Sequence, residues 1–292
     1  MDNVNQKATP FLSIVIANYN YGKMLPVAIE SVLSQDCNDY ELIIVDGNST
    51  DNSVEVIKHY AKHLSWWVSE PDKGQSNAFN KGFAHAKGVL LTWLNADDIM
   101  LPGTISAVKS ALLTNPSADY ATGNFLRFLN SDHTISEAKW GPHFLPYWLQ
   151  GKGRYSVTFG PTTFWRRSVY EKLGPIDESL HYTMDTEYWA RMMMAGHKQV
   201  RVNHYCWGFR MHEDSKTAEF DTHERSQKIK EVMNKEHEYI RNKNNYNPTK
   251  FWRYVGLLWR VVDGSLIHSA FNNLFYVGKS LESQFDINYS ID

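Results

Sequence analysis

The chain has 292 residues, of which 42% are hydrophobic and 21% charged, proportions typical of a folded globular protein rather than a disordered one. Its 30 Lys and Arg against 32 Asp and Glu give a net charge of -2. General nucleic-acid binders need a basic excess to neutralise phosphates, so no nucleic-acid partner is expected. The length suffices for one large α/β domain with an appendage.

Predicted strands and helices alternate in the first 116 residues. After a polar lead-in at residues 1–10, short apolar runs rich in β-branched residues predict strands at 11–17, 41–45, 66–68 and 89–94. Between them, apolar residues recur at helical spacing and predict helices at 25–33, 54–60 and 78–86. This alternation favours βαβ units and a largely parallel sheet, so the predicted fold class is α/β.

Polar clusters follow each of these predicted strands, at residues 18–20, 46–51, 72–74 and 95–98. In open parallel sheets, ligands bind outside the carboxyl ends of the strands. Because those ends share one edge of the sheet, we expect the four loops to converge on a pocket with acidic walls.

The pattern is less regular from residue 117 to residue 245. Strand-like pieces occur at 120–128 and 156–165, a clear helix is predicted at 184–195, and the segment 218–243 is charged and compatible with a helix. We expect an α+β half that packs against the edge of the sheet and supplies the site of a second substrate.

Residues 246–292 are expected to form a helical appendage. Between 250 and 267, apolar residues form a stripe along one side of the predicted helix, with basic residues on its flank. A stripe of this kind can lie on a membrane surface. The alternative is that residues 250–285 dock on the catalytic domain or on a second subunit, as in a dimer.

The two cysteines, Cys37 and Cys206, are too few for a disulfide framework and form no metal-binding pattern. Residues 1–10 do not resemble a signal peptide, and no apolar run approaches the ~20 residues of a membrane span. We therefore expect a cytoplasmic protein, whose membrane contact would be peripheral, at the inner membrane face.

The loop after the fourth predicted strand contains two adjacent carboxylates, Asp97 and Asp98. Carboxylates placed together repel each other unless a cation lies between them, and Mg²⁺ or Mn²⁺ takes such ligands together with phosphate oxygens. An isolated pair is more often a solvated turn that caps the next helix. The position of this pair in an ordered series of polar loops favours the metal-binding interpretation.

The polar loops belong to a longer series of motifs. In the first half these are Ser13-Ile-Val-Ile-Ala-Asn-Tyr-Asn20, Glu41-Leu-Ile-Ile-Val-Asp-Gly-Asn-Ser-Thr-Asp51, Asp72-Lys-Gly-Gln-Ser-Asn-Ala78 and Trp93-Leu-Asn-Ala-Asp-Asp98. In the second half they are Thr163-Phe-Trp-Arg-Arg-Ser168, Gly174-Pro-Ile-Asp-Glu-Ser179 and Met184-Asp-Thr-Glu-Tyr-Trp189. In this order, over about residues 11–217, the chain resembles an inverting family 2 glycosyltransferase of the bacterial surface-polysaccharide type.

The resemblance implies a GT-A fold, a Rossmann-like, mostly parallel sheet flanked by helices. It implies a nucleotide-sugar-binding half at 11–116 and an acceptor-binding half with the catalytic base at 117–245. It does not cover the appendage at 246–292.

The resemblance implies that the loop after the first strand holds the nucleotide base, with Tyr19 stacking on it between Asn18 and Asn20. A loop tyrosine packed on its own domain is the alternative for Tyr19. Asp46 matches a carboxylate that accepts a hydrogen bond from the ring N–H of the base. Gly47 stands where many relatives have a second Asp, so this contact falls to Asp46 or to the backbone.

Asp72, Lys73 and Gly74 resemble the loop that approaches the ribose and the diphosphate. Glycine permits a close approach of the backbone, and the Lys73 ammonium could offset phosphate charge. A surface turn is an equally good interpretation of Lys73.

The metal site of the family matches the loop at 95–98, with Asn95 where the first Asp is often found. This departure leaves Asp98 as the expected ligand of Mn²⁺ or Mg²⁺ and Asp97 as a contact to the donor sugar or ribose. The segment 210–217 resembles a loop that folds over the donor. In it, His212 is a second candidate ligand, or an ordinary surface histidine, and basic side chains are candidate phosphate clamps.

Asp185 matches the catalytic base of the family, at the start of the predicted helix 184–195. The acidic pair common in the family is Met184-Asp185 here, so the base is retained and its acidic neighbour is not. A base must remove the proton of the acceptor hydroxyl as it attacks the anomeric carbon, which inverts its configuration. A helix N-terminus lowers the pKa of an Asp, and a simple helix cap is the alternative role.

Together these features predict a metal-dependent, inverting glycosyltransferase. It would move a sugar from a nucleotide-diphosphate donor, with a UDP-sugar favoured, to a hydroxyl of a glycan or lipid-linked glycan in polysaccharide or glycan biosynthesis. One alternative is a nucleotidyltransferase on a related fold, although the loop 18–23 lacks the Gly-rich basic character that a triphosphate requires. The other is a non-catalytic nucleotide-sugar or carbohydrate-binding module, which Asn95 and Met184 keep open.

Overall fold

The computed structural model describes residues 9–141, 160–213, 215–216, 223–244, 250–287 and 289–290. Most of the predicted lead-in, residues 1–8, and part of the predicted strand 156–165, residues 156–159, lie outside this description.

The first half of the chain forms the predicted parallel sheet. Its strands are β1 (Leu12–Asn18), β2 (Tyr40–Asp46), β3 (Trp66–Ser69) and β4 (Leu90–Asn95), which pair in parallel in the order β3-β2-β1-β4. The connecting helices are α1 (Leu25–Leu33), α2 (Ser53–Tyr60) and α3 (Gln75–His85). Each of the four strands lies within one residue of its predicted bounds, because short, fully apolar runs are a strong local signal for a buried strand.

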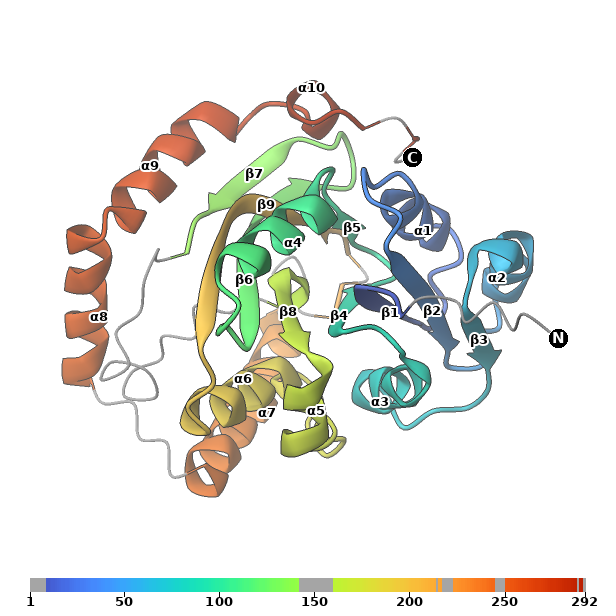
Figure 1. Cartoon of the computed structure of the whole chain (residues 1–292), viewed down its shortest axis with the longest axis horizontal. Coiled ribbons are helices and arrows are strands. Elements are labelled where there is room, and N and C mark those ends of the chain that lie inside the picture. The colour runs from blue at the N-terminus through green and yellow to red at the C-terminus, as the bar shows by residue number, and fades with distance from the viewer. Residues whose placement is uncertain are drawn as a thin grey trace, which may run out of the picture.

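Helices cover both faces of this sheet (Figure 1). Successive side chains of a strand point to opposite faces. Ile14 and Ile16 pack with α1, α2 and α4 (Thr104–Thr114), whereas Val15 packs on the other face with α3, α5 (Arg167–Leu173) and α6 (Met184–Met194). The core therefore consists of two apolar layers, one on each side of the sheet.

The second half continues the same sheet, now with mixed strand directions. Its strands are β5 (Ile99–Met100), β6 (Tyr120–Leu129), β7 (Ile135–Lys139), β8 (Thr163–Arg166) and β9 (Gln199–Met211). β8 pairs antiparallel with β4 and so joins the two halves. The full order is β3-β2-β1-β4-β8-β6-β9-β5, with β7 paired to the outer part of β6. The predicted parallel sheet and α+β half are thus parts of one continuous layer.

Two features of this half differ from the predictions. The strand expected at 156–165 is limited, within the described residues, to 163–166, because Gly160–Thr162 forms a 3-10 turn and Pro161 has no N–H to donate to a neighbouring strand. The strands β7 and β9 were not predicted. β9 shifts register twice against β6, and its alternating Val200 and Val202 were the only regular signal.

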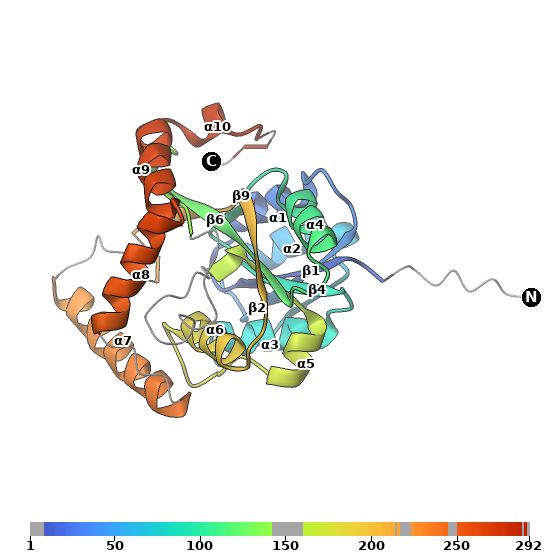
Figure 2. The ribbon, with the colours of Figure 1, turned by 60° about the vertical axis from the view of Figure 1, so that its left-hand side comes forward.

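The C-terminal region is helical, as predicted. It contains α7 (His223–Lys243), α8 (Lys250–Val262), α9 (Ser265–Tyr276) and the short α10 (Leu281–Gln284). Figures 1 and 2 show α8 and α9 end to end along one flank of the molecule, where α9 lies against β7. The backbone of Ile135 donates to Lys279 O (2.9 Å), which ties the segment after α9 to the sheet. No helix of the described residues has the length and apolarity that a bilayer span requires.

Candidate active site

A cavity of about 880 Å³ opens at the carboxyl edge of β1, β2 and β4, a volume within the range of small-molecule sites. The loops of the first half form one wall, and residues 160–161, 181–185, 207–209 and 215–216 contribute the other. Seven of the predicted site residues line it: Asn18, Tyr19, Asp72, Gly74, Asn95, Asp97 and Asp185. The predicted residues that lie behind or beside the wall are Asn20, Asp46, Lys73, Asp98 and His212.

Asp46 organises the loops behind this wall. It is fully buried, and one carboxylate oxygen accepts hydrogen bonds from Asn18 Nδ2 (2.6 Å) and Ser49 Oγ (2.5 Å). The other accepts from Ser69 Oγ (2.6 Å) and the backbone of Ser49. With both oxygens taken by the protein, Asp46 does not fit the predicted contact with a nucleotide base.

Asn20 joins the loops that follow β1 and β2. Its φ of 58° places it in the left-handed region, which Asn tolerates better than most residues. Its Oδ1 accepts from the backbone of Thr50 (2.8 Å), and its own N–H donates to Ser49 Oγ (2.8 Å). This cross-link leaves the preceding Tyr19 projecting along the cavity, 60% exposed, as a stacking surface for a ring.

Asp72 occupies the space next to Gly47. A Cβ on Gly47 would lie 2.7 Å from Asp72 Oδ2 and 3.3 Å from Tyr19 Cδ2. The other oxygen of Asp72 accepts from the N–H of Gly74 (2.7 Å). The sequence suggested that a carboxylate is lost at Gly47, whereas the structure brings one there from another loop. Gly47 itself was not among the predicted site residues, and only the folded arrangement shows its proximity to Asp72.

The rest of this loop begins α3. Gly74 has a φ of 111°, a conformation that favours glycine, and it lies directly before the first residue of the helix. Lys73 is exposed at the rim, where its N–H donates to Asn77 Oδ1 (3.3 Å). The structure thus places Gly74 in the cavity wall and Lys73 outside it.

The two carboxylates of the acidic turn have different environments. Asp98 is 1% exposed, and it accepts hydrogen bonds from Asn95 Nδ2 (2.7 Å) and the backbone N–H of Arg210 (3.0 Å). Burial, together with the charge of Asp97, raises the pKa of Asp98 well above its usual range. Asp97 lines the cavity, and its Oδ2 lies 3.1 Å from His212 Nε2. This geometry favours Asp97 over Asp98 as the metal ligand, the reverse of the assignment from the sequence.

Asp97 and His212 fit a divalent cation whose other ligands come from elsewhere. The described residues contain no group of three or more His, Cys, Asp or Glu side chains placed to hold a metal. His212 is 7% exposed, and its Nδ1 has no hydrogen-bond partner among the residues described. One carboxylate and one imidazole are a donor set that Mn²⁺ accepts, and phosphate oxygens would complete it.

Arg210 holds the acidic turn in place. Its Nε donates to the backbone O of Asp97 (2.9 Å) and its Nη1 to Asn130 Oδ1 (2.8 Å), and its guanidinium lies over the ring of Phe128. Arg210 is buried in this role, so it does not fit the predicted phosphate clamp. Lys216 does line the cavity, where burial lowers its pKa against the opposing charges of Glu236 and Asp185.

Asp185 faces the donor half from across the cavity, in the first turn of α6. Its Oδ1 accepts from the N–H of Thr186 (2.6 Å), and burial raises its pKa. The residue at the N-cap position is Thr183, so Asp185 is not the cap that the sequence left as an alternative. Met184, where relatives have an acid, accepts a hydrogen bond from Ser76 Oγ through its sulfur (2.9 Å).

The loop before α6 is fixed by Glu236 of α7, a residue that the sequence did not single out. The Glu236 carboxylate, 8% exposed, accepts from the backbone N–H groups of His181 (2.6 Å), Tyr182 (3.0 Å) and Thr183 (2.9 Å). Three successive donors on one carboxylate define the conformation of this loop, and hence the direction in which α6 presents Asp185.

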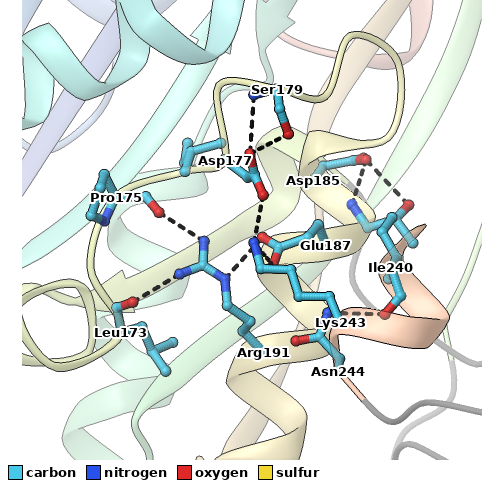
Figure 3. A network of polar contacts seen from close by, with 12 residues as sticks. Leu173, Pro175, Asp177, Ser179, Asp185, Glu187, Arg191, Ile240, Lys243 and Asn244 are labelled. Carbon is cyan, nitrogen blue, oxygen red and sulfur yellow. Dashed lines mark hydrogen bonds and ion pairs between the residues drawn. The ribbon is translucent and has the colours of Figure 1, made fainter. Parts of the chain in front are cut away.

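A second network ties the end of α7 to α6 (Figure 3). Glu187 is fully buried, with Arg191 Nε at 2.8 Å and Lys243 Nζ at 3.1 Å. Lys243 also pairs with Asp177, whose carboxylate accepts from Ser179. Buried charges are tolerated when they are paired in this way. Glu187 and Arg191 are therefore parts of the scaffold that supports Asp185.

Comparison with known proteins places the chain among sugar-transferring enzymes. Residues 13–174 match the family model described as glycosyl transferase family 2. The chain is 34% identical over 182 residues to an uncharacterized glycosyltransferase of Nostoc sp., covering 57% of this chain and 54% of the relative. It is 26% identical over 185 residues to a PGL/p-HBAD biosynthesis glycosyltransferase of Mycobacterium bovis, covering 62% of this chain and 69% of the relative. It thus spans only about half of the Nostoc relative.

Solved structures share the fold. S. aureus TarS in complex with UDP-GlcNAc aligns with a TM-score of 0.56 at 15% identity, covering 76% of this chain and 64% of that chain. The mannosyltransferase PcManGT from Pyrobaculum calidifontis, in complex with GDP-Man and Mn²⁺, aligns with a TM-score of 0.53 at 18% identity, covering 70% and 58%. Since the family model covers more than half of its residues and the fold agrees, this chain belongs to glycosyl transferase family 2.

Proposed function

We propose that the protein transfers a sugar from a nucleotide-diphosphate donor to an acceptor hydroxyl, with inversion at the anomeric carbon. One observation carries this proposal: a single cavity brings Tyr19 and Asp97 from the first half opposite Asp185 from the second. A stacking surface, a carboxylate for a cation and a base with a raised pKa are the groups that such a transfer needs. The family match supports the reaction class.

The nucleotide end of the donor lies between the loops after β1 and β3. There the ring of Tyr19 offers its face to a base, and the carboxylate of Asp72 is placed to accept a hydrogen bond from a ring N–H. Uracil has such a donor at N3, and we favour a UDP-sugar. The complexes of TarS with UDP and UDP-GlcNAc support this choice, whereas PcManGT was solved with GDP-Man.

The diphosphate lies next to Asp97 and His212, which would hold Mn²⁺ or Mg²⁺. A bound cation supplies neutralisation of the charge on the departing diphosphate. From the opposite wall, the Lys216 ammonium faces the same space and adds positive charge. The narrow approach past Gly74 lets the backbone of this loop come close to the donor.

Asp185 accepts the proton of the acceptor hydroxyl as its oxygen forms a bond to the anomeric carbon. The bond from that carbon to the diphosphate oxygen breaks, and its electron pair leaves with the nucleoside diphosphate. Because its pKa is raised, Asp185 binds this proton more tightly than an exposed Asp would, which makes it the stronger base. We propose a glycan or lipid-linked glycan as the acceptor; the mycobacterial relative is named for PGL/p-HBAD biosynthesis.

Thermal-shift measurements with UDP-, GDP-, dTDP- and CMP-sugars, each with and without Mn²⁺, test the donor site. A ligand that binds only the folded state stabilises it by about 2.7 kcal/mol at a concentration 100-fold above its Kd. We expect a Mn²⁺-dependent rise in Tm with UDP-sugars. The absence of a shift with every nucleotide sugar would contradict the donor site.

A donor-consumption assay then tests turnover. Release of UDP that Asp185→Asn suppresses, while the donor still raises Tm, supports the transferase. Binding without any turnover would indicate a binding module, and release of pyrophosphate from a nucleotide triphosphate would indicate a nucleotidyltransferase.

A further inference from the structure

The outer face of α8 and α9 exposes an unusual number of large apolar side chains to solvent. We propose that this face binds the surface of an anionic lipid bilayer without crossing it. Its most exposed members, here called the flank patch, are Phe251, Leu258, Val262, Ile267, Phe271 and Leu274. The proposal concerns a surface remote from the sugar-transfer chemistry, and it does not depend on the proposed function.

The polarity of α9 is reversed relative to a helix that docks on a protein in water. Its inner side is polar: Ser269 Oγ donates to Trp140 O (2.9 Å), and Asn273 Oδ1 accepts from the N–H of Ala138 (2.8 Å). Its outer side carries Phe271 and Leu274, which are 68% and 86% exposed. A helix in water normally turns its apolar side to the core, so an apolar outer side indicates a non-aqueous surface.

The patch continues from α9 onto α8. Leu258 and Val262 are four residues apart and so lie on one side of α8, and both are exposed. Gly264, with a φ of 77°, ends one helix and begins the next, so the two helices form a bent pair along one flank (Figure 2). Monomeric proteins in water rarely expose contiguous apolar surface of this extent.

The charges around the patch favour an anionic partner. Residues 250–279 contain four Lys or Arg, at 250, 253, 260 and 279, against one acid, Asp263, while the whole chain has a net charge of -2. Lys279 Nζ lies 3.8 Å from the centre of the Phe275 ring, at the border of the apolar surface. Basic side chains beside an apolar helix face are the arrangement that binds anionic headgroups.

A second copy of this chain is a less suitable occupant. A two-fold dimer through the patch would place the same basic segment on both sides of the interface, where like charges repel. A bilayer with anionic lipids offers both an apolar layer and the opposite charge. The two helices, of 13 and 12 residues, are each too short to span its core, which takes ~20 residues.

Flotation of the full chain with lipid vesicles tests the proposal. We expect binding to vesicles of phosphatidylcholine mixed with phosphatidylglycerol, weaker binding to phosphatidylcholine alone, and a decrease at high salt. The double variant Leu258→Glu/Phe271→Glu should lose at least about tenfold in affinity, because it places two charges in the apolar contact. Leu113→Glu on α4, at a site 72% exposed and outside the patch, is the matched control and should bind as the unmodified chain does.

Circular dichroism and Tm, measured for each variant, establish that it is folded. Loss of binding in the folded double variant alone supports the proposal. Failure of the unmodified chain to float with either vesicle, or equal binding by the double variant, would overturn it. Light scattering gives the remaining outcome: a dimer that the double variant converts to a monomer would assign the patch to a second copy and refute lipid binding.

Discussion

Two neighbouring carboxylates in the turn after β4 differ because of what surrounds each one. Asp98 faces the interior and accepts hydrogen bonds from Asn95 and from the backbone of Arg210. Asp97 faces the cavity and His212. Asn95 has a structural reason to be an amide: its Nδ2 donates to the buried Asp98, where a carboxylate would repel it.

Asp97→Asn and Asp98→Asn are expected to have opposite effects. Asp97→Asn should abolish the Mn²⁺ dependence of UDP-sugar binding with little change in Tm, because it removes a charge that faces the cavity. Asp98→Asn should keep the metal dependence and lower stability by about 1–3 kcal/mol, the usual cost of an unsatisfied buried group. Thermal shifts with and without Mn²⁺ measure both effects. The reverse result would restore the assignment made from the sequence.

Asp185 determines the expected pH dependence. A base acts only when deprotonated, and burial raises the pKa of Asp185, so kcat should rise with pH along a limb that lies above the ordinary range of Asp. Lys216 lowers that pKa, so Lys216→Met should move the limb further up. Asp185→Asn should reduce kcat by about 10²–10⁴-fold with donor binding near normal. A limb unchanged in Lys216→Met would contradict the assignment.

The same shift has a consequence for stability. Because the folded state holds the Asp185 proton more tightly than the unfolded state does, its stabilising contribution is complete at low pH. That contribution is lost as the pH rises through the folded pKa.

At the scale of elements, α7 acts as a brace for the catalytic half. It lies outside the segment that matches the family model, yet Glu236 fixes residues 181–183 and Lys243 neutralises Glu187 (Figure 3). A helix that contributes no side chain to the cavity wall thus determines where Asp185 points.

Glu236→Gln should therefore lower kcat about tenfold or more while the KM for the donor changes little, since small displacements of a reacting group are costly. An amide has a single acceptor oxygen, so it leaves part of the three N–H groups unpaired. Glu238→Gln, an exposed site on the same helix, is the matched control. Initial rates at varied donor concentration measure the effect. If kcat is unchanged while Tm falls, Glu236 is structural only and does not position the base.

For the whole molecule, one sheet unites both halves of the active site. β8 of the second half pairs with β4 of the first, and Trp93 of the first half stacks on Trp189 of the second at 5.1 Å. Trp165 contacts both of these rings. The halves predicted at 11–116 and 117–245 therefore share a core.

Unfolding in urea should consequently show one transition for both halves. Far-ultraviolet circular dichroism reports the helices, and tryptophan fluorescence reports the cluster that joins the halves. We expect the two curves to coincide, as they do in a two-state system, and to shift together when donor and Mn²⁺ are added. Two separated transitions would show that the halves are independent domains.

Much of the fold could be read locally. The strands β1 to β4 were placed within one residue, since each is a short apolar run bounded by polar turns. β9 was missed because its residues are mixed, and its pairing with β6 and β5 depends on contacts far away in the chain. Residues 156–159 of the predicted strand lie outside the described structure.

The sequence by itself determined the α/β class, the polar loops at one sheet edge, the family and the candidate base Asp185, because hydrophobic periodicity and contiguous motifs are local properties. The tertiary structure alone decided which acid of the turn faces the cavity, that Asp72 occupies the space beside Gly47, and that Glu236 fixes the loop before α6. These outcomes depend on burial and on hydrogen bonds between residues distant in the chain. The direction of a side chain is set by the neighbours that folding brings to it.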